Sequence, residues 1–299
     1  MRLLTTLNDL RDERAAWQRT GATVGLLPTM GYLHAGHLSH AHAARAENAI
    51  AVASIFVNPT QFGPNEDLAR YPRDLERDLA LLDGAGVDAV FAPTAAAMYP
   101  ADFNTWVEPS GPLTERLEAA HRPGHFRGVA TIVAKLLLLV APTRAYFGQK
   151  DAQQVAVVRR LIADLNLPVE LRVGPIIREP DGLAMSSRNV YLHGEARTAA
   201  TALSHALEAG RAAWESLSAP ASAESVREAM RAVVAAEPLA ALDYAEVCDP
   251  DTCLPLTTAQ APALLAIAAR IGPTRLIDNY LLRADGSWEI GHRVNELGQ

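Results

Sequence analysis

Short apolar runs alternate with amphipathic stretches along the first half of the chain, and this alternation is typical of βαβ units with a parallel sheet. The predicted strands are residues 23–29, 49–58, 87–93, 144–148 and 169–175. The predicted helices are residues 37–48, 74–86, 129–142 and 151–166. The run at 23–29 is apolar enough for a strand buried on both faces, as in a parallel sheet covered by helices. The pattern therefore indicates the α/β fold class.

The pattern changes near Gly174 and Pro175, where the regular alternation ends. Two alanine-rich helices are predicted at residues 195–217 and 222–237. Strand-like runs separated by turn residues follow at residues 242–247, 263–271 and 274–282. We therefore expect two domains, a larger α/β domain over residues 1–175 and a smaller α+β domain over residues 176–299.

The composition is that of a folded protein. The 299 residues are 49% hydrophobic and 20% charged, and the formal net charge is -7. Acidic and basic residues are interspersed, so the chain has no basic face of the kind that binds a nucleic-acid backbone. The N-terminal stretch lacks the continuous apolar region of a signal peptide, and the apolar run after Lys135 is too short to span a bilayer. We expect a cytoplasmic protein without nucleic-acid or membrane partners.

Two cysteines, Cys248 and Cys253, stand in a C-x4-C spacing that matches no zinc framework and has no histidines nearby. We expect them to be ordinary reduced thiols. The sequence thus predicts no metal site built by the protein itself.

Two histidines stand three residues apart in the stretch LLPTMGYLHAGH, directly after the first predicted strand. Gly31 and Gly36 allow close approach of the backbone, and a helix that begins near Gly36 offers unpaired N–H groups and a positive dipole end. Together with His34 and His37, this helix start suits an anion, in particular a polyphosphate. A pair of histidines on a solvated turn is the competing interpretation, and a zinc site would lack a third ligand of matching spacing.

Two further segments place polar side chains just after predicted strands, where ligands bind in parallel sheets. Asn58 and Gln61 offer neutral amides to a small polar ligand. Lys150 and Asp151 place a cation for phosphate beside a carboxylate for a ribose hydroxyl. The competing interpretations are a turn that satisfies its own amides and a capped helix with a surface lysine.

The last polar segment contains Ser186, Ser187 and Arg188, a compact set of donors that suits phosphate. The stretch RPGHFRGVAT adds His125 and Arg127 between glycines. That stretch reads as a mobile flap as readily as a spacer.

Taken together and in order, these blocks resemble the pantothenate synthetase (pantoate–β-alanine ligase) family over nearly the whole chain. The first block is similar to the HxGH nucleotide-binding signature of the HxGH nucleotidyltransferase superfamily. The blocks that carry the resemblance are PTMGYLHAGH, FVNPTQFGPNEDLARYPRDLERD, RPGHFRGVATIVAKL, FGQKDAQQ, REPDGLAMSSRNVYL and TRLIDN.

The resemblance implies a Rossmann-like parallel sheet flanked by helices, with a smaller α+β C-terminal domain that closes over the active site, and a homodimer. It implies a ligase that condenses (R)-pantoate with β-alanine to pantothenate through a pantoyl adenylate, releasing AMP and pyrophosphate. ATP is then a substrate. Mg²⁺ accompanies the ATP phosphates, so that no metal cage built by the protein is needed.

The resemblance also implies roles for particular residues. The implied ATP contacts are Met30, Gly31, Tyr32, Leu33, His34, Ala35, Gly36, His37, Gly148, Gln149, Lys150, Asp151, Ile177, Met185, Ser186, Ser187 and Arg188. The implied catalytic residues are His37, His34, Lys150 and Arg188, with His37 the residue usually assigned as proton donor. Gln61 and Gln154 match the glutamines that hold pantoate, and Gln61 also borders the β-alanine position.

Departures from the family pattern are few. Ala35 stands where the family often has an acidic residue, and Gln149 stands where Glu is common, so we expect tuning rather than loss of activity. The alternative enzyme is another HxGH adenylyltransferase that acts on a phosphorylated small molecule. A phosphorylated acceptor calls for cationic residues, whereas Asn58 and Gln61 supply only neutral amides. A tRNA synthetase is disfavoured because no part of the chain fits an anticodon-binding domain. A regulator that only binds nucleotide is disfavoured because it has no need of so many phosphate-facing side chains.

Overall fold

The computed structural model describes residues 1–218 and 221–296, so residues 219–220 and 297–299 of the expected second domain lie outside the described part. The chain forms two compact units. Unit 1 consists of Met1–Thr114, Glu118–Gly148 and Val157–Gly174, and unit 2 consists of Glu115–Leu117, Gln149–Ala156 and Pro175–Gln299. The expected boundary at residue 175, and the closing of the second domain over the site, stay predictions.

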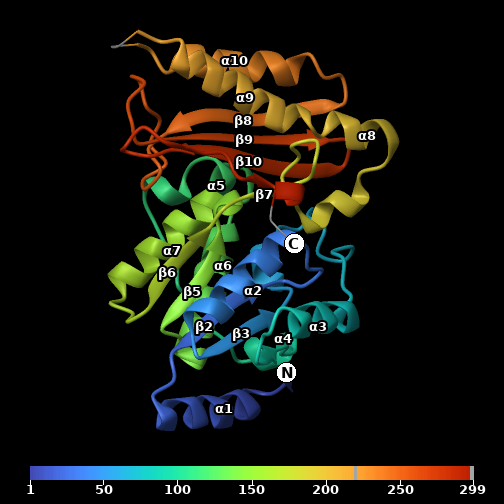
Figure 1. Ribbon diagram of the computed structural model, residues 1–299, viewed down its shortest axis with the longest axis vertical. Helices are drawn as coiled ribbons and strands as arrows, with labels where there is room; N and C mark the ends of the chain where they lie inside the picture. Colours follow the sequence, from blue (N-terminus) through green and yellow to red (C-terminus); the bar gives the residue numbers. More distant parts are fainter. Residues whose placement is uncertain (219–220, 297–299) are drawn as a thin grey trace. The chain divides into compact units, whose positions relative to one another are not determined.

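Unit 1 is built on a six-stranded sheet whose strands are all parallel, in the order β1-β4-β3-β2-β5-β6. Figure 1 labels the neighbouring strands β3, β2, β5 and β6. The strands are β1 (Arg2–Leu4), β2 (Val24–Thr29), β3 (Ile50–Ile55), β4 (Ala89–Phe91), β5 (Arg144–Gly148) and β6 (Glu170–Gly174). The predicted α/β class with a Rossmann-like parallel sheet is confirmed. The strand order reverses between β2 and β5, and ligands of such sheets bind outside the carboxyl ends of the strands at this switch point.

The helices of unit 1 connect these strands. They are α1 (Leu7–Thr20), α2 (Ala35–Glu47), α3 (Leu75–Gly84), α4 (Ala95–Met98), α5 (Glu118–His121) and α6 (His125–Val140). Two short 3-10 turns, η1 (Pro59–Gln61) and η2 (Pro112–Thr114), also belong to this unit. The 3-10 turn η3 (Gln149–Asp151) begins unit 2's next segment, and α7 (Ala152–Asp164) starts in unit 2 and continues in unit 1.

The central strand β2 is buried on both faces. Successive residues of a strand point to opposite faces, and Leu27 joins a buried cluster with Leu33, Ala41 of α2 and Leu82 of α3. Its neighbour Leu26 points the other way and is also fully buried. Helices α2 and α6 both pack against β2. This double cover is why the strand reads as a continuous apolar run instead of an alternating one.

Helix α1 has no counterpart among the sequence predictions, although its end signals are present. Thr6 and Asp9 form a capping box at the start, where each side chain pairs with the other residue's backbone N–H. Gly21 ends the helix with a φ of 66°. Only Leu10 and Trp17 of this helix are buried, so its apolar stripe is too narrow for the periodic pattern to stand out.

The stretch Arg122–Thr131, interpreted above as a flap or a spacer, is mostly the first part of α6, and that interpretation is wrong. The helix begins at His125, four residues before the predicted start at 129, and Phe126 and Val129 are buried within it. Gly124 precedes it with a φ of 81°, a conformation that favours glycine.

Unit 2 contains a four-stranded antiparallel sheet in the order β11-β10-β9-β8. Its strands are β8 (Ala240–Cys248), β9 (Ala263–Ile271), β10 (Thr274–Leu282) and β11 (Trp288–Glu289). A separate parallel pair joins β7 (Ile177–Arg178) to β12 (His292–Arg293). The helical elements are η4 (Ser187–Tyr191), α8 (Gly194–Ala199), α9 (Ala202–Glu215), α10 (Glu224–Ala235) and η5 (Val294–Glu296).

The predicted single helix at 195–217 is divided into α8 and α9 at Ala200 and Thr201. The backbone N–H and the hydroxyl of Thr201 both donate to the carbonyl of Thr198. This backbone bond reaches back three residues in place of the four of an α-helix, and the helix is interrupted there. The smaller α+β composition expected for this part of the chain is confirmed.

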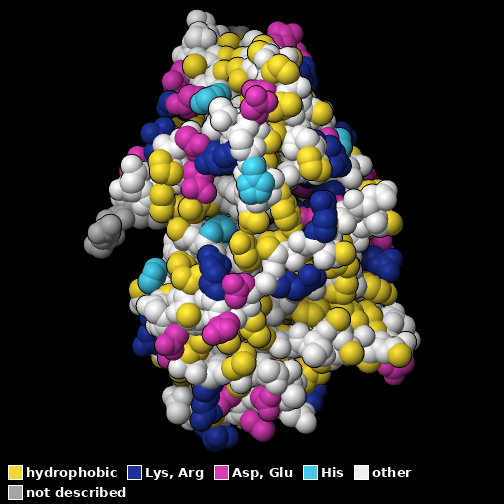
Figure 2. Space-filling view, turned by 90° about the vertical axis from the view of Figure 1, so that its right-hand side faces the viewer, with side chains coloured by type: hydrophobic (Ala, Val, Ile, Leu, Met, Phe, Trp, Pro, Cys, Tyr) yellow, Lys and Arg dark blue, Asp and Glu magenta, His cyan; other side chains and the backbone are white. Residues whose placement is uncertain are grey.

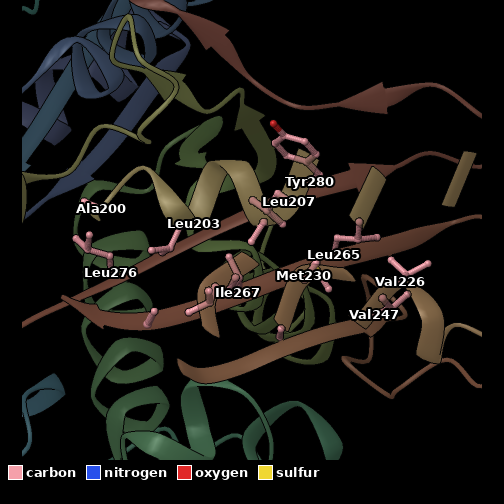
Figure 3. Close-up of a cluster of buried hydrophobic side chains, with 14 of the residues drawn as sticks. Ala200, Leu203, Leu207, Val226, Met230, Val247, Leu265, Ile267, Leu276 and Tyr280 are labelled. Carbon is pink, nitrogen blue, oxygen red and sulfur yellow. The ribbon is translucent and has the colours of Figure 1, made fainter. Parts of the chain in front are cut away.

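Helices α9 and α10 pack over the antiparallel sheet and form the core of unit 2 (Figure 3). Leu207 of α9 and Met230 of α10 meet Leu265 and Ile267 of β9 in one buried cluster. Gly210 allows the close approach, since a Cβ atom there would lie 2.7 Å from Cγ of Met230. Burial of each large apolar side chain stabilises the fold by about 1.5–3 kcal/mol, so this cluster stabilises the unit.

Charged side chains of both signs are interspersed among apolar ones on the face drawn in Figure 2. This distribution agrees with the mixed charge pattern of the sequence. In the described ranges no helix combines the length and the apolar composition needed to cross a membrane.

Candidate functional site

The turn that follows β2 has a backbone shape that few residues adopt. Gly31 and Tyr32 have φ angles of 81° and 48°, both in the left-handed region. The hydroxyl of Thr29 accepts from the N–H of Gly31 and donates to the carbonyl of Ser54 on β3. The turn is thus anchored at its start to the neighbouring strand.

A buried carboxylate on α3 holds the centre of this turn. Asp78 is 1% exposed, and its two oxygens accept from the backbone N–H groups of Tyr32 at 2.6 Å and Leu33 at 2.8 Å. Burial raises the pKa of Asp78, and the two N–H donors act in the opposite direction. The adjacent Arg77 donates to the carbonyl of Leu33 at 2.9 Å and lies over the ring of Tyr32. Asp78 therefore fixes two backbone N–H groups of the turn, and Arg77 fixes one of its carbonyl groups.

The two histidines of the turn form the N-terminal cap of α2. Nδ1 of His34 accepts from the N–H of Gly36 at 3.2 Å, and Nδ1 of His37 accepts from the N–H of His34 at 3.3 Å. Their ring centroids are 4.1 Å apart. Because Nδ1 is an acceptor in both rings, the neutral form of each carries its hydrogen on Nε2. Both imidazoles are thus set as Nε2–H donors at a helix N-terminus, which suits an anion.

His40 lies one turn further along α2 than His37 and is 8% exposed. Its ring occupies the space beside Gly148 and Gly174, the last residues of β5 and β6, and a Cβ atom at Gly174 would lie 2.2 Å from two ring atoms. Glycine is required there because any side chain would collide with the imidazole. Burial lowers the pKa of His40 to about 4, so the ring is neutral near neutral pH.

Gln61 at the end of η1 is oriented from both ends of its amide. The Nδ2 of Asn58, which is 1% exposed, donates to Oε1 of Gln61 at 2.9 Å and to the carbonyl of Gly128 at 3.2 Å. Nε2 of Gln61 donates to the sulfur of Met30 at 3.3 Å. The structure thus brings Met30 and Gln61, predicted for different substrates, into contact. Sulfur is a weak acceptor and an amide nitrogen has two hydrogens, so Gln61 keeps donor capacity.

An ionic group lies behind Gln61. Arg122 makes a bidentate pair with Glu66 at 2.7 and 2.8 Å, and also donates to Nε2 of His125 at 3.1 Å. An arginine only donates, so Nδ1 of His125 carries the hydrogen and donates to the carbonyl of Gln61 at 2.9 Å. Burial, and then the charge of Arg122, lower the pKa of His125 to about 4. The neutral imidazole holds the backbone of Gln61 in place.

In unit 2, the segment after β5 carries the residues predicted to face ribose and phosphates. Gln149 is buried, Lys150 and Gln154 are partly buried, and Asp151 is exposed. Within the described ranges the ammonium group of Lys150 has no carboxylate partner. Its charge is thus available for an anionic ligand.

The second predicted segment of unit 2 is a tight return of the chain after β7. The N–H of Met185 donates to the carbonyl of Ile177 at 2.8 Å, which brings these two predicted ATP contacts together. The hydroxyl of Ser186 accepts from the N–H of Arg188 at 3.2 Å and caps η4. Ser187 is buried at 7% exposed, and Arg188 is partly exposed. Ser186 therefore acts locally as a cap, whatever its contact with a ligand.

The predicted site residues belong to both units: Met30–His37, Gln61 and Gly148 to unit 1, and Gln149–Asp151, Gln154, Ile177 and Met185–Arg188 to unit 2. Their roles toward a ligand stay predictions. The supporting roles of Asp78, Arg122 and His125 were not predicted from the sequence. The one sequence signal that could have pointed to Asp78 is its place as a charged residue on the apolar side of the predicted helix 74–86.

The cysteines and the acidic residues form no metal site in the described part of the chain. Cys248 and Cys253 are free and buried. No group of three or more His, Cys, Asp or Glu side chains in the described residues is arranged to hold a metal ion.

A parallel sheet whose central strand ends in an HxGH turn at the start of a helix is the arrangement of a nucleotide-binding protein of the α/β class. Residues 2–281 match the model of the pantoate-beta-alanine ligase family, and the chain belongs to this family.

Similar proteins agree with this assignment. The pantothenate synthetase of Roseiflexus sp. (strain RS-1) is 59% identical over 285 residues, which cover 95% of this chain and 100% of that protein. The crystal structure of pantothenate synthetase from Thermus thermophilus is 52% identical, with a TM-score of 0.88 over 93% of this chain and 98% of that one. The pantoate-beta-alanine ligase of Francisella tularensis, complexed with beta-gamma ATP and beta-alanine, is 32% identical, with a TM-score of 0.77 over 94% and 97% of the two chains.

The Asp78 contacts predict that Asp78→Asn loosens the turn after β2. Asparagine keeps the shape but has one acceptor oxygen, so one of the N–H groups of Tyr32 and Leu33 would face an amide nitrogen. We expect the amide hydrogens of these two residues to exchange with solvent about tenfold faster or more, as measured by NMR. Asp83→Asn, at an exposed position of the same helix, should leave both rates unchanged. Equal rates in Asp78→Asn and the parent protein would contradict the anchoring role.

Proposed function

We propose that this chain condenses (R)-pantoate with β-alanine to give pantothenate, using ATP and passing through a pantoyl adenylate. Membership of the pantoate-beta-alanine ligase family supports this reaction, since the match spans residues 2–281. The observation that carries the chemistry is the pair of Nε2–H donors of His34 and His37 at the N-terminus of α2.

In the first step the pantoate carboxylate attacks the α-phosphorus of ATP and pyrophosphate leaves. Negative charge grows on the equatorial oxygens and on the departing pyrophosphate, so fixed donors matter more than a nucleophilic side chain. His34 and His37 supply such donors, with the positive end of the α2 dipole behind them. Lys150, unpaired by carboxylates of the described residues, adds a cation for the phosphates. We assign the proton donation to His37, in line with the family resemblance.

Pantoate is held, in this proposal, by the neutral amides of Gln61 and Gln154. Gln61 is fixed by Asn58 and by the backbone contact of His125, yet its amide nitrogen keeps a hydrogen to donate. A neutral donor binds hydroxyl and carboxylate oxygens without lowering the nucleophilicity of the carboxylate as strongly as a cation would. Gln61 also borders the place from which β-alanine reacts.

In the second step the amine of β-alanine attacks the acyl carbon of the adenylate, the bond from that carbon to the bridging oxygen breaks, and AMP leaves. The attacking amine must be uncharged, and the proton that it loses as the amide forms leaves with the phosphate of AMP. No acyl-enzyme is needed, because the adenylate already provides a good leaving group. The protein's part is to hold the two reactants in contact and keep water away.

The remaining ATP contacts in this proposal are the residues that the family resemblance implied. In unit 1 they are Met30 to Ala35, Gly36 and Gly148. In unit 2 they are Gln149, Asp151, Ile177, Met185, Ser186, Ser187 and Arg188, and we assign the guanidinium of Arg188 to the phosphates with Lys150.

Three further parts of the proposal concern the surroundings of the reaction. Mg²⁺ arrives on the ATP phosphates, since this ion keeps much of its water and binds through substrate phosphates. The carboxylate of Asp78 is not assigned to the ion, because both of its oxygens accept from backbone N–H groups. The dependence on ATP favours the cytoplasm as the place of reaction. The family resemblance favours a homodimer.

A product assay tests the reaction as a whole. Pyrophosphate release should require ATP and pantoate alone, because adenylate formation precedes the use of β-alanine. Release of AMP should require β-alanine as well. Quantifying both products with each substrate omitted in turn checks the order. Formation of ADP and phosphate in place of AMP and pyrophosphate would defeat the adenylate route.

The helix-cap geometry predicts that His37→Ala abolishes most adenylate formation while the fold survives. Loss of one donor of this kind costs about 10²- to 10³-fold in rate, by analogy with donors that stabilise oxyanions. The single-turnover rate of pyrophosphate release measures the step directly. His42→Ala, at an exposed position of the same helix, is the matched control and should keep the parent rate. A His37→Ala rate equal to that of the control would remove His37 from the mechanism.

A further inference from the structure

Two adjacent polar residues, Asp278 and Asn279, are buried near the middle of β10 and have no assigned role in the reaction. They are 3% and 2% exposed. They belong to the block TRLIDN, which carried part of the family resemblance. Successive residues of a strand point to opposite faces, so the two side chains serve different neighbours.

Asp278 makes a bidentate ion pair with Arg178, the residue after the predicted ATP contact Ile177. The two nitrogen–oxygen distances are 2.7 and 2.9 Å, and Arg178 is 4% exposed. The guanidinium also donates to the carbonyls of Ile290 at 2.6 Å and Gly182 at 2.9 Å. Every branch of the buried cation is therefore paired, which is the condition under which a buried ion pair is tolerated.

The contacts of Arg178 fix a predicted ATP-binding segment. Gly182 lies in the tight return between β7 and Met185, and Met185 is itself bonded to Ile177. Arg178 belongs to β7 and donates to Gly182 in the return that follows. Its pairing with Asp278 therefore fixes the position from which the segment starting at Met185 continues.

Asn279 grips the other predicted ATP-binding segment of unit 2. Its Nδ2 donates to the carbonyls of Gln149 at 3.0 Å and Lys150 at 2.9 Å, and its Oδ1 accepts from Nε2 of Gln149 at 3.1 Å. Both amide hydrogens and the oxygen are used. The backbone from which the Lys150 side chain projects is thus attached to the same strand that holds Arg178.

We propose that Asp278 and Asn279 are positioning residues for ATP: they fix the segments 149–151 and 177–188 to one strand, and so set the spacing between the donors on these segments. The inference rests on the proposed function, which assigns both segments to ATP. Strand β10 is suited to this task because it is paired along its whole length with β9 and also with β11. Neither residue contacts ATP itself in this proposal.

The test is Asn279→Asp, which keeps the shape of the side chain but removes both hydrogens donated to the carbonyls of residues 149 and 150. The matched control is Asn48→Asp. Asn48 is also buried, at 7% exposed; its Nδ2 donates to Ala44 and Tyr146, and its Oδ1 accepts from Arg144. It lies at the far end of α2 from His37.

The measurements are the ATP dissociation constant, by calorimetry on the full-length chain, and the single-turnover rate of pyrophosphate release. We expect Asn279→Asp to weaken ATP binding about tenfold or more and to slow pyrophosphate release by about 10²-fold, because a misplacement of about 1 Å costs that much. Asn48→Asp should lower the melting temperature but leave both quantities within about twofold of the parent protein. Asn279→Ala and Asn48→Ala repeat the comparison without a buried charge, in case the aspartate variants do not fold.

The outcomes are distinct. ATP binding and release rates of either Asn279 variant equal to those of the parent would overturn the positioning role. Equal losses in the Asn279 and Asn48 variants would also overturn it, because general destabilisation would then account for both. A parent protein that neither binds ATP nor releases pyrophosphate would instead defeat the proposed function.

Discussion

Every buried backbone N–H and C=O group needs a partner, and at the predicted site this requirement is met by side chains that do not face a ligand. In unit 1 the left-handed turn at Gly31 and Tyr32 leaves two N–H groups inside the protein, and the carboxylate of Asp78 accepts both. In unit 2 Asn279 satisfies the carbonyls of residues 149 and 150. The positions of the candidate ligand-binding groups depend on these few buried contacts.

A common electrostatic design follows from the contacts. Nδ1 of His34 accepts from the N–H of Gly36 and Nδ1 of His37 accepts from the N–H of His34, so that Nε2–H is the remaining ring donor of each histidine. The buried charges are largely compensated internally, as in the pairs of Arg122 with Glu66 and of Arg178 with Asp278. No carboxylate of the described residues pairs with Lys150. Fixed donors and a cation without a carboxylate partner suit a reaction in which charge moves along a triphosphate.

Much of the fold follows from local sequence, because strands buried on both faces leave continuous apolar runs. The strands 263–271 and 274–282 are found with their predicted bounds, since Gly272 and Pro273 mark the turn between them. The break between α8 and α9 was not predictable, because alanine and threonine at positions 200 and 201 carry no strong stop signal. The HxGH turn is local and could be recognised. The partners that hold it and Lys150 lie 46 and 129 residues away in sequence, so that only the folded chain reveals them.

The central claim is that the pantoate carboxylate becomes bonded to the α-phosphorus of ATP before the amide forms. Isotope transfer tests it most directly: pantoate labelled with ¹⁸O in its carboxylate is converted with β-alanine and ATP, and the products are analysed by mass spectrometry. The adenylate route predicts one ¹⁸O atom in AMP, since the bridging oxygen leaves with the phosphate. AMP without label, or label in inorganic phosphate or pyrophosphate, would contradict it.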